Sequence, residues 1–224
     1  MPHTARSLGP VAVVGLESRY IHEVLDVLAR AGIAIAACLP SRFDSEVTHG
    51  VPALQDFAAW TTANRGALFT IPLLTPGRRK RAVEEAIAAG LVVPPAIVDP
   101  TAVVSRTTVL GDGTVVNALA AIGANGVIGR QVQINRTASL GHDLALEDYV
   151  TVGPNVTICG NCVIERGAYI GAGATLAPKV RIGANSMVGA GTVVVRDVPP
   201  NTVVVGNPAK VVREGIAGYR DIGV

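Results

Sequence analysis

One pair of adjacent residues in this sequence could carry out proton transfer: His142 is followed directly by Asp143. An imidazole titrates near neutral pH and can take a proton from an attacking amine or hydroxyl group. A carboxylate bonded to the second ring nitrogen would fix the tautomer and stabilise the imidazolium. The pair therefore predicts a general base, His142, with Asp143 as its helper. The plain alternative is a surface histidine with no catalytic task.

The residues around this pair repeat every six positions. From Val98 to Val188 every sixth residue is aliphatic, and a small or β-branched residue follows four positions later in nearly every case. This period is typical of a parallel β-helix, in which each hexapeptide supplies one strand and one corner and three hexapeptides close a coil. The aliphatic residues fill the interior, and each coil binds only its neighbours. Because His142 stands two positions after the inward-facing Leu140, we expect its side chain to point outward.

An α/β unit is predicted before the repeat. Strands are expected at Val11–Val14, Ile33–Leu39 and Ala67–Ile71, with one helix ended by Gly32 and another that starts at Thr75-Pro76 and ends at Gly90. This order of elements favours a small parallel sheet of the Rossmann type. The predicted domains are residues 1–97 and 98–224. The basic run Arg78–Arg81, in the last helix, is expected to form a solvated face.

The composition limits the function classes. The 224 residues carry a net charge of +2 and only 4% aromatic residues, so nothing indicates a nucleic-acid partner. There is no signal peptide and no apolar run long enough to cross a membrane, so we expect a cytoplasmic protein. The three cysteines do not suggest a disulfide framework.

A Cys-x-x-C motif, Cys159 to Cys162, could elsewhere indicate zinc or redox chemistry. Here no second pair accompanies it, and Cys162 falls on a small corner position of the repeat. We expect it to be structural, with no metal site. A zinc enzyme of the γ-carbonic anhydrase type would need several histidines on the coil, which has only His142. A sugar nucleotidyltransferase would need a Gly-rich, basic signature in the first half, and a non-catalytic scaffold remains open.

Two segments resemble a known family. The stretch Asn135-Arg136-Thr137-Ala138-Ser139-Leu140-Gly141-His142-Asp143 and the later Gly206-Asn207-Pro208-Ala209-Lys210 are similar to those of two-domain bacterial sugar acetyltransferases. These are the sialic acid O-acetyltransferase type and the amino-sugar N-acetyltransferases. The resemblance implies a left-handed β-helix, acetyl-CoA as co-substrate and direct transfer with His142 as the base. It also implies a sugar acceptor and a homotrimer with active sites between adjacent chains.

The resemblance also suggests where the two substrates bind. Residues eighteen apart stack on one another, so His142 and Gly160 share one column and Ala172 and Ala190 another. These small residues would leave room for the pantetheine arm, the Gly160 N–H could steady the thioester oxygen, and Lys210 would lie near the coenzyme A nucleotide. An equally plain explanation is that corners favour small residues. The acceptor-binding residues are expected to be Glu17, Ser18, Arg19 and Asn135.

Three positions depart from the family pattern. The family's glycine-rich loop after the first strand is replaced here by Gly15 followed by residues 16–20, in which Glu17 would repel a phosphate at a helix N-terminus. Residues 39–42, Leu-Pro-Ser-Arg, lack the usual acidic residue, and Thr151 stands where a second histidine is common. We therefore expect weak or no binding of ordinary nucleotide-linked amino sugars. The identity of the sugar or of another acceptor, the acyl group, and the choice between amide and ester are left open.

Overall fold

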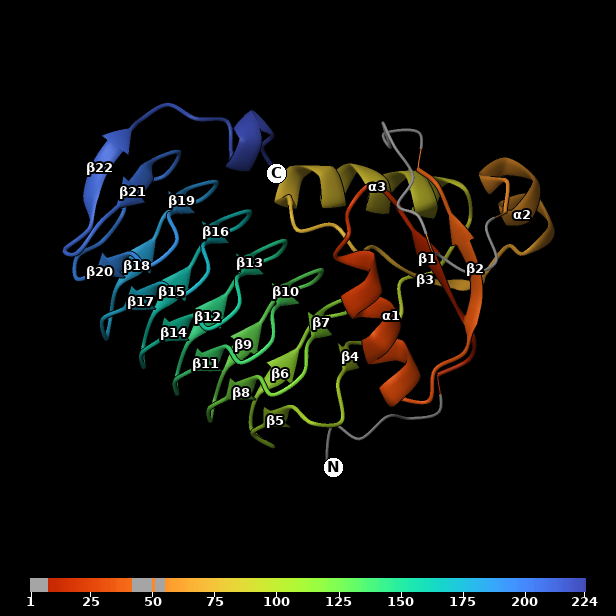
Figure 1. Ribbon diagram of the computed structural model, residues 1–224, viewed down its shortest axis with the longest axis horizontal. Helices are drawn as coiled ribbons and strands as arrows, with labels where there is room; N and C mark the ends of the chain where they lie inside the picture. Colours follow the sequence, from red (N-terminus) through yellow and green to blue (C-terminus); the bar gives the residue numbers. More distant parts are fainter. Residues whose placement is uncertain (1–7, 42–49, 51–54) are drawn as a thin grey trace.

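The computed structural model describes residues 8–41, 50 and 55–224. It consists of an α/β unit packed against a β-solenoid (Figure 1). Of the predicted loop at 39–42, Arg42 lies outside the described residues. Among the helices that are described, none combines the length and the apolar character needed to cross a bilayer.

The α/β unit contains a three-stranded parallel sheet, as the sequence predicted. Its elements, in chain order, are β1 (Val11–Val14), α1 (Ile21–Arg30), β2 (Ile35–Leu39), α2 (Phe57–Ala63), β3 (Leu68–Thr70) and α3 (Pro76–Ala88). The strand order is β2-β1-β3. Helix α1 buries Ile21, Val24, Val27 and Leu28, which recur at helical spacing. Gly32 and Gly90 follow α1 and α3 with φ of 67° and 90°, a conformation that glycine adopts without strain.

The hexapeptide repeat forms the predicted β-solenoid. The two-residue strands are β4 (Ile97–Val98), β5 (Val103–Val104), β6 (Val109–Leu110), β7 (Val115–Val116), β8 (Ala121–Ile122), β9 (Val127–Ile128), β10 (Gln133–Ile134), β11 (Ser139–Leu140), β12 (Ala145–Leu146), β13 (Thr151–Val152), β14 (Thr157–Ile158), β15 (Val163–Ile164), β16 (Tyr169–Ile170), β17 (Thr175–Leu176), β18 (Arg181–Ile182), β19 (Met187–Val188) and β20 (Val193–Val194). Each pairs in parallel with the strand three places along the chain, so that Leu140, for example, lies beside Ile158.

These strands make three sheets, the faces of a triangular coil. We name them by one strand each: the β10 sheet, the β11 sheet and the β12 sheet. The aliphatic residues of the repeat form one continuous buried core from Val116 to Val204. The inward pattern predicted from the sequence is confirmed, and the left hand of the coil stays a prediction.

The corners of the coil repeat a left-handed backbone conformation. Asn125, Asp143, Asn155, Asn161 and Asn185 all have positive φ at equivalent corners. Asparagine and aspartate tolerate this conformation better than other residues with a side chain. Asp143 therefore meets the backbone requirement of a corner, with φ of 52°, while its carboxylate remains available for chemistry.

The α/β unit packs on the β10 sheet through a buried arginine. The Arg79 guanidinium donates hydrogen bonds to the backbone oxygens of Leu73, Gln131, Tyr149 and Val150 and to the Thr151 hydroxyl. Burial lowers the pKa of Arg79 to about 9, so it stays charged at neutral pH. The expectation that residues 78–81 form a solvated face is wrong for Arg79, whose side chain is fully buried.

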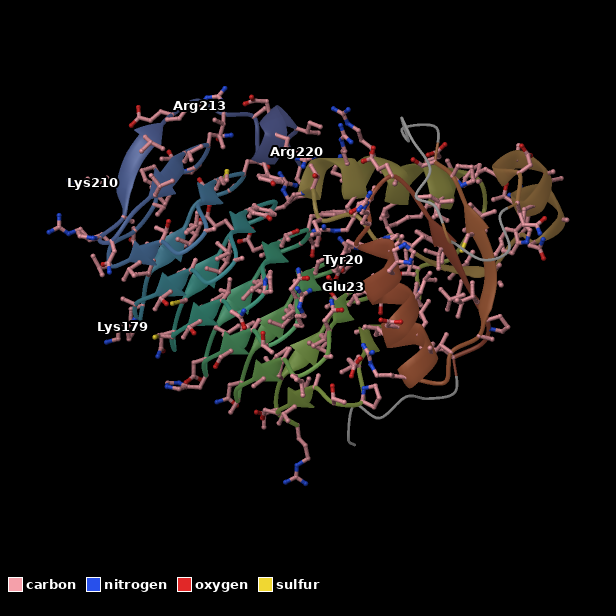
Figure 2. The ribbon with its side chains drawn as sticks, viewed as in Figure 1. Tyr20, Glu23, Lys179, Lys210, Arg213 and Arg220 are labelled. Carbon is pink, nitrogen blue, oxygen red and sulfur yellow. The ribbon has the colours of Figure 1, made fainter. Side chains whose placement is uncertain are left out.

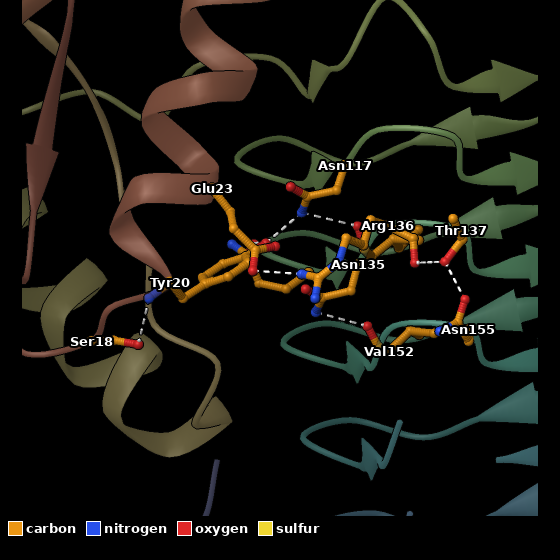
Figure 3. Close-up of polar contacts among 11 residues, drawn as sticks. Ser18, Tyr20, Glu23, Asn117, Asn135, Arg136, Thr137, Val152 and Asn155 are labelled. Carbon is orange, nitrogen blue, oxygen red and sulfur yellow. Dashed lines mark hydrogen bonds and ion pairs between the residues drawn. The ribbon is translucent and has the colours of Figure 1, made fainter. Parts of the chain in front are cut away.

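Helix α1 makes further polar contacts with the same face of the solenoid (Figure 3). The Tyr20 hydroxyl donates to Gln133 Oε1 at 3.1 Å and accepts from the Asn117 amide. Arg136 donates to Glu23, and Arg30 donates to the buried Asp99 at 2.6 Å. Together with Arg79, these contacts fix the α/β unit on one face of the coil.

The chain closes the solenoid with a hairpin. Strand β21 (Val203–Val205) pairs in parallel with β19, and β22 (Lys210–Arg213) pairs antiparallel with β21. This is the closing strand that the sequence predicted. The chain then runs back through a short 3₁₀ helix, η1 (Tyr219–Asp221), and ends beside the start of α3 (Figure 1).

Candidate active site

The predicted catalytic pair forms a hydrogen-bonded group at the corner between β11 and β12. His142 Nδ1 lies 2.7 Å from Asp143 Oδ2, and the Asn125 amide donates to Asp143 Oδ1 at 3.0 Å. The hydrogen bonds from His142 and then Asn125 lower the pKa of Asp143 below its usual value. The carboxylate is thus ionised at neutral pH and accepts the Nδ1 proton, which leaves Nε2 as the basic nitrogen.

The imidazole of His142 is exposed and rests on Gly160. Its side chain is 63% exposed, which confirms the expected outward orientation. A Cβ atom on Gly160 would lie 2.8 Å from both Cε1 and Nε2 of the ring, too close for the ring to keep this position. Gly160 thus explains the orientation of the base through the space that it leaves. No hydrogen bond from its N–H is found within the described residues, and the oxyanion role stays a prediction.

The corner that carries His142 leads along the coil axis to a pocket at the end of the solenoid. Gly160, Pro178 and Arg196 follow His142 at eighteen-residue intervals, and the parallel register stacks them. The pocket measures about 380 Å³ and is lined by Val195–Pro199, Val204 and Pro208–Val211. It therefore contains both Arg196 and the predicted Lys210, two cations suited to phosphate groups.

Three other predicted residues lie at a different corner. Ala172 and Ala190 are exposed between the β10 and β11 sheets. Asn135 lies at the same kind of corner but is buried, and its amide donates to the Val152 carbonyl at 3.0 Å (Figure 3). Within one chain, none of the three lies at the corner that carries His142.

Three of the four predicted acceptor residues come together in a second pocket, and Asn135 is not among them. Glu17, Ser18 and Arg19, in the loop between β1 and α1, line a pocket of about 460 Å³ with Leu73, Leu74, Thr75, Arg78, Tyr169, Tyr219 and Arg220. Arg78 donates to both carboxylate oxygens of Glu17 at 2.6 Å. This ion pair neutralises Glu17 and removes the reason to expect repulsion of a phosphate.

Seven of the ten residues that line this pocket are not predicted from the sequence. Arg78 lies in the run expected to be a solvated face, and Tyr169, Tyr219 and Arg220 belong to no motif. Tyr169 and Tyr219 are fifty residues apart, yet their rings stack at 3.8 Å between centroids and 4° between planes. No local pattern in the sequence signals such a pairing.

Within a single chain, the base and the acceptor pocket lie on different sides of the solenoid. His142 lies where the β11 and β12 sheets meet, whereas the α/β unit and Tyr169 belong to the β10 face. Figure 2 shows Lys179, at a later corner of the His142 edge, on the side of the solenoid away from the α/β unit. The base and the acceptor pocket of the same molecule therefore face different directions.

Neither Thr151 nor Cys162 presents a reactive group to this site. Thr151 is fully buried, and its hydroxyl donates to the Leu74 carbonyl at 2.8 Å, so it joins the two parts of the chain. Cys162 is buried at an inward corner position, as predicted, and donates to the Ala177 carbonyl. Burial raises the pKa of its thiol, which disfavours the reactive thiolate.

Comparisons with known proteins support the assignment of the fold. Residues 161–196 match the family model described as bacterial transferase hexapeptide (six repeats). No curated protein matches the sequence. The solved structure of a histidine-to-asparagine variant of perosamine N-acetyltransferase from Caulobacter crescentus, in complex with CoA and GDP-perosamine, superposes with a TM-score of 0.83 at 30% identity, over 92% of this chain and 98% of that chain.

Two further structures are similar over nearly the whole chain. The acetyltransferase domain of PglB from Neisseria gonorrhoeae, in complex with acetyl coenzyme A, gives a TM-score of 0.81 at 26% identity, over 91% of this chain and 98% of that one. WeeI from Acinetobacter baumannii gives 0.80 at 25% identity, over 92% and 100% of the two chains.

Proposed function

Because this chain belongs to the family of hexapeptide-repeat nucleotide-sugar N-acetyltransferases, we propose that it transfers an acetyl group from acetyl-CoA to the amine of a nucleotide-linked amino sugar. The observation that carries the proposal is the hydrogen-bonded group formed by Asn125, Asp143 and His142, whose imidazole is exposed and lies over Gly160. The relative's name specifies transfer to nitrogen, which favours an amide over an ester.

The proposed mechanism uses the geometry of His142 directly. Nε2 accepts a proton from the acceptor amine as its nitrogen attacks the thioester carbon, and Asp143 holds the resulting imidazolium through Nδ1. The tetrahedral intermediate then collapses, the carbon–sulfur bond breaks, and the proton on Nε2 passes to the departing CoA thiolate. The products are an amide and free CoA, and no acyl-enzyme forms.

Acetyl-CoA is proposed to lie along the edge of the solenoid that carries His142. Three coils separate His142 from Arg196, or about 14 Å at the usual spacing of neighbouring strands. The pantetheine arm would follow this edge past Gly160. The nucleotide end would occupy the pocket lined by Arg196 and Lys210, whose cations would bind its phosphates.

The active site is proposed to form between copies of the chain, in a homotrimer. A single chain directs His142 and its acceptor pocket to different sides, so a complete site needs the base of one copy and the pocket of another. Ala172 and Ala190, at the other edge of the β11 sheet, would then line the coenzyme A groove from the second copy. Asn135 would approach the acceptor from that copy in the same way.

The proposal is tested by incubation of the protein with acetyl-CoA and a set of nucleotide-linked amino sugars. Mass spectrometry should show one added acetyl group, and NMR should place it on nitrogen. Acetylation at a hydroxyl, or no transfer to any amino sugar while another acceptor is acetylated, would contradict the proposed acceptor class.

A further inference from the structure

The C-terminal segment, residues 214–224, runs from the end of the solenoid back to the α/β unit and forms one wall of the acceptor pocket. Two hydrogen bonds connect Ile216 with Asn201, and the Val224 N–H donates to Asn185 Oδ1 at 3.0 Å. Ile216 is buried, at 3% exposure. These contacts hold the segment in a defined path across the coils.

The segment packs closely against the start of α3. A Cβ on Gly77 would lie 2.5 Å from the carbonyl oxygens of both Ile222 and Gly223. On the solenoid side, Tyr219 stacks on Tyr169, and burial, followed by this contact, raises the pKa of Tyr169 to about 12. This close packing holds Tyr219, which is half-buried, and the exposed Arg220 in the wall of the pocket.

The charges that line the pocket leave two arginines available. Arg78 is paired with Glu17. Within the described part of the chain, neither Arg19 nor Arg220 has an ion-pair partner, since the neighbouring Asp221 binds Arg213 at 3.1 Å. Arg220 and Asp221 both have left-handed backbones, with φ of 59° and 57°, a conformation that needs support from surrounding contacts. The segment thus holds Arg220 beside the pocket (Figure 2) with its charge uncompensated.

We infer that the C-terminal segment completes an anion-binding subsite, in which Arg220 and Arg19 bind the diphosphate of a nucleotide-linked acceptor in place of the glycine-rich loop that this chain lacks. Guanidinium groups bind phosphate oxygens through charge-assisted, often bidentate hydrogen bonds. The inference deepens the proposed function and rests on it for the identity of the acceptor. It does not depend on acetyl transfer, because the binding of the anion precedes that step.

The experiment measures binding of GDP, UDP, dTDP and inorganic pyrophosphate to the full chain by calorimetry, without acetyl-CoA. At least one nucleoside diphosphate should bind to the wild type, more tightly than pyrophosphate. Arg220→Ala and Arg19→Ala should each weaken it by roughly ten- to a hundredfold, the usual effect of losing a hydrogen bond to a charged group. Arg220→Lys should retain part of the affinity. Arg65→Ala, which removes an exposed arginine outside the pocket, is the charge-matched control and should bind like the wild type.

Three outcomes would overturn the inference. The first is that no nucleoside diphosphate binds to the wild type, and the second is that Arg220→Ala binds with unchanged affinity. The third is an equal loss in Arg65→Ala, because the effect would then be one of net charge. Unchanged melting temperatures would separate a lost contact from a lost fold. If GDP binds through Arg220 but no acetyl transfer is found, the subsite stands and the proposed function fails. If the protein transfers acetyl groups but Arg220→Ala binds the acceptor with unchanged affinity, the proposed function stands and the subsite fails.

Discussion

His142 owes its orientation to three neighbours, each with a separate task. Asp143 fixes the ring tautomer, Asn125 holds the Asp143 carboxylate, and Gly160 leaves the space in which the ring lies. The corner backbone explains why these residues meet, because it stacks positions eighteen apart. Much of this arrangement could be predicted from the sequence, since the adjacent pair and the repeat together indicate an outward base on a stacked column. The Asn125 contact could not, because many corners of this coil carry asparagine.

Replacement of His142 by alanine should lower turnover by on the order of 10²–10⁴-fold, the usual contribution of a positioned base. Asp143→Asn should cost less, because it removes the helper and keeps the base. Affinity for acetyl-CoA, measured by calorimetry, should change little in either variant. Wild-type turnover in His142→Ala, or an acetyl adduct on Cys159 that passes into product, would contradict the mechanism.

Gly160→Ala should lower turnover by about tenfold or more, because the added methyl group would displace the imidazole and misplaced catalytic groups are costly. The melting temperature should not change, since the ring is exposed and can move away. A double-mutant cycle provides the control. In a His142→Ala background, Gly160→Ala should have no further effect on turnover, and an equal loss there would show that Gly160 acts on something other than the base.

The solenoid strands and the packing of α3 differ in how well the sequence predicts them. The solenoid strands could be predicted almost residue by residue, because each inward position repeats and depends only on its neighbours. The packing of α3 could not, because Arg79 bonds mainly to backbone oxygens and a carbonyl leaves no trace in the sequence. The same limit applies to Tyr169 and Tyr219, whose contact depends on the path of the C-terminal segment.

At the solenoid corner that Cys162 occupies, the Cys162→Ala variant should fold and remain active. The thiol is buried and bonded only to backbone within the described structure, so its loss should cost about 1–2 kcal/mol of unfolding free energy, typical of a small packing change. Denaturant unfolding and metal analysis check this together. Stoichiometric zinc that disappears along with activity in the variant would overturn the structural role.

The contact between α1 and the first coil should depend on pH. Burial raises the pKa of Asp99, but the bonds from Thr101 and Arg30 outweigh it and hold the pKa below the usual value. A lowered folded-state pKa stabilises the fold above the unfolded-state pKa, near 3.9, and this contribution is lost as the pH falls from there through the folded value.

Asp99→Asn should therefore reduce stability at pH 7 by roughly 1–3 kcal/mol, as for a hydrogen bond to a charged group, and the difference from the wild type should shrink in strong acid. Urea unfolding across this pH range makes the measurement. Asp26→Asn, on the exposed side of the same helix, is the matched control. A constant difference at every pH would show that charge at Asp99 is not the cause.

At the scale of the whole molecule, the chain should act as a homotrimer with shared sites. Light scattering should give the mass of three chains, and a stable monomer with full turnover would contradict the proposal.

A complementation test examines the shared sites directly. His142→Ala lacks the base, and Ser18→Trp should fill the acceptor pocket, so each homotrimer should be inactive. Mixed trimers should regain activity where an intact base faces an intact pocket, and no recovery on mixing would exclude sites shared between chains.

Each coil of the solenoid adds the same distance along its axis. Arg196 lies three coils beyond His142, in the pocket that also contains Lys210, so the number of coils between the base and this pocket sets the length of the donor that fits. Removal of one whole coil would shorten that interval by about 4.8 Å, the spacing of neighbouring strands, and would keep every inward residue in register. A relative of this protein could therefore adopt a shorter or longer acyl donor through a change in repeat number alone, without a new active site.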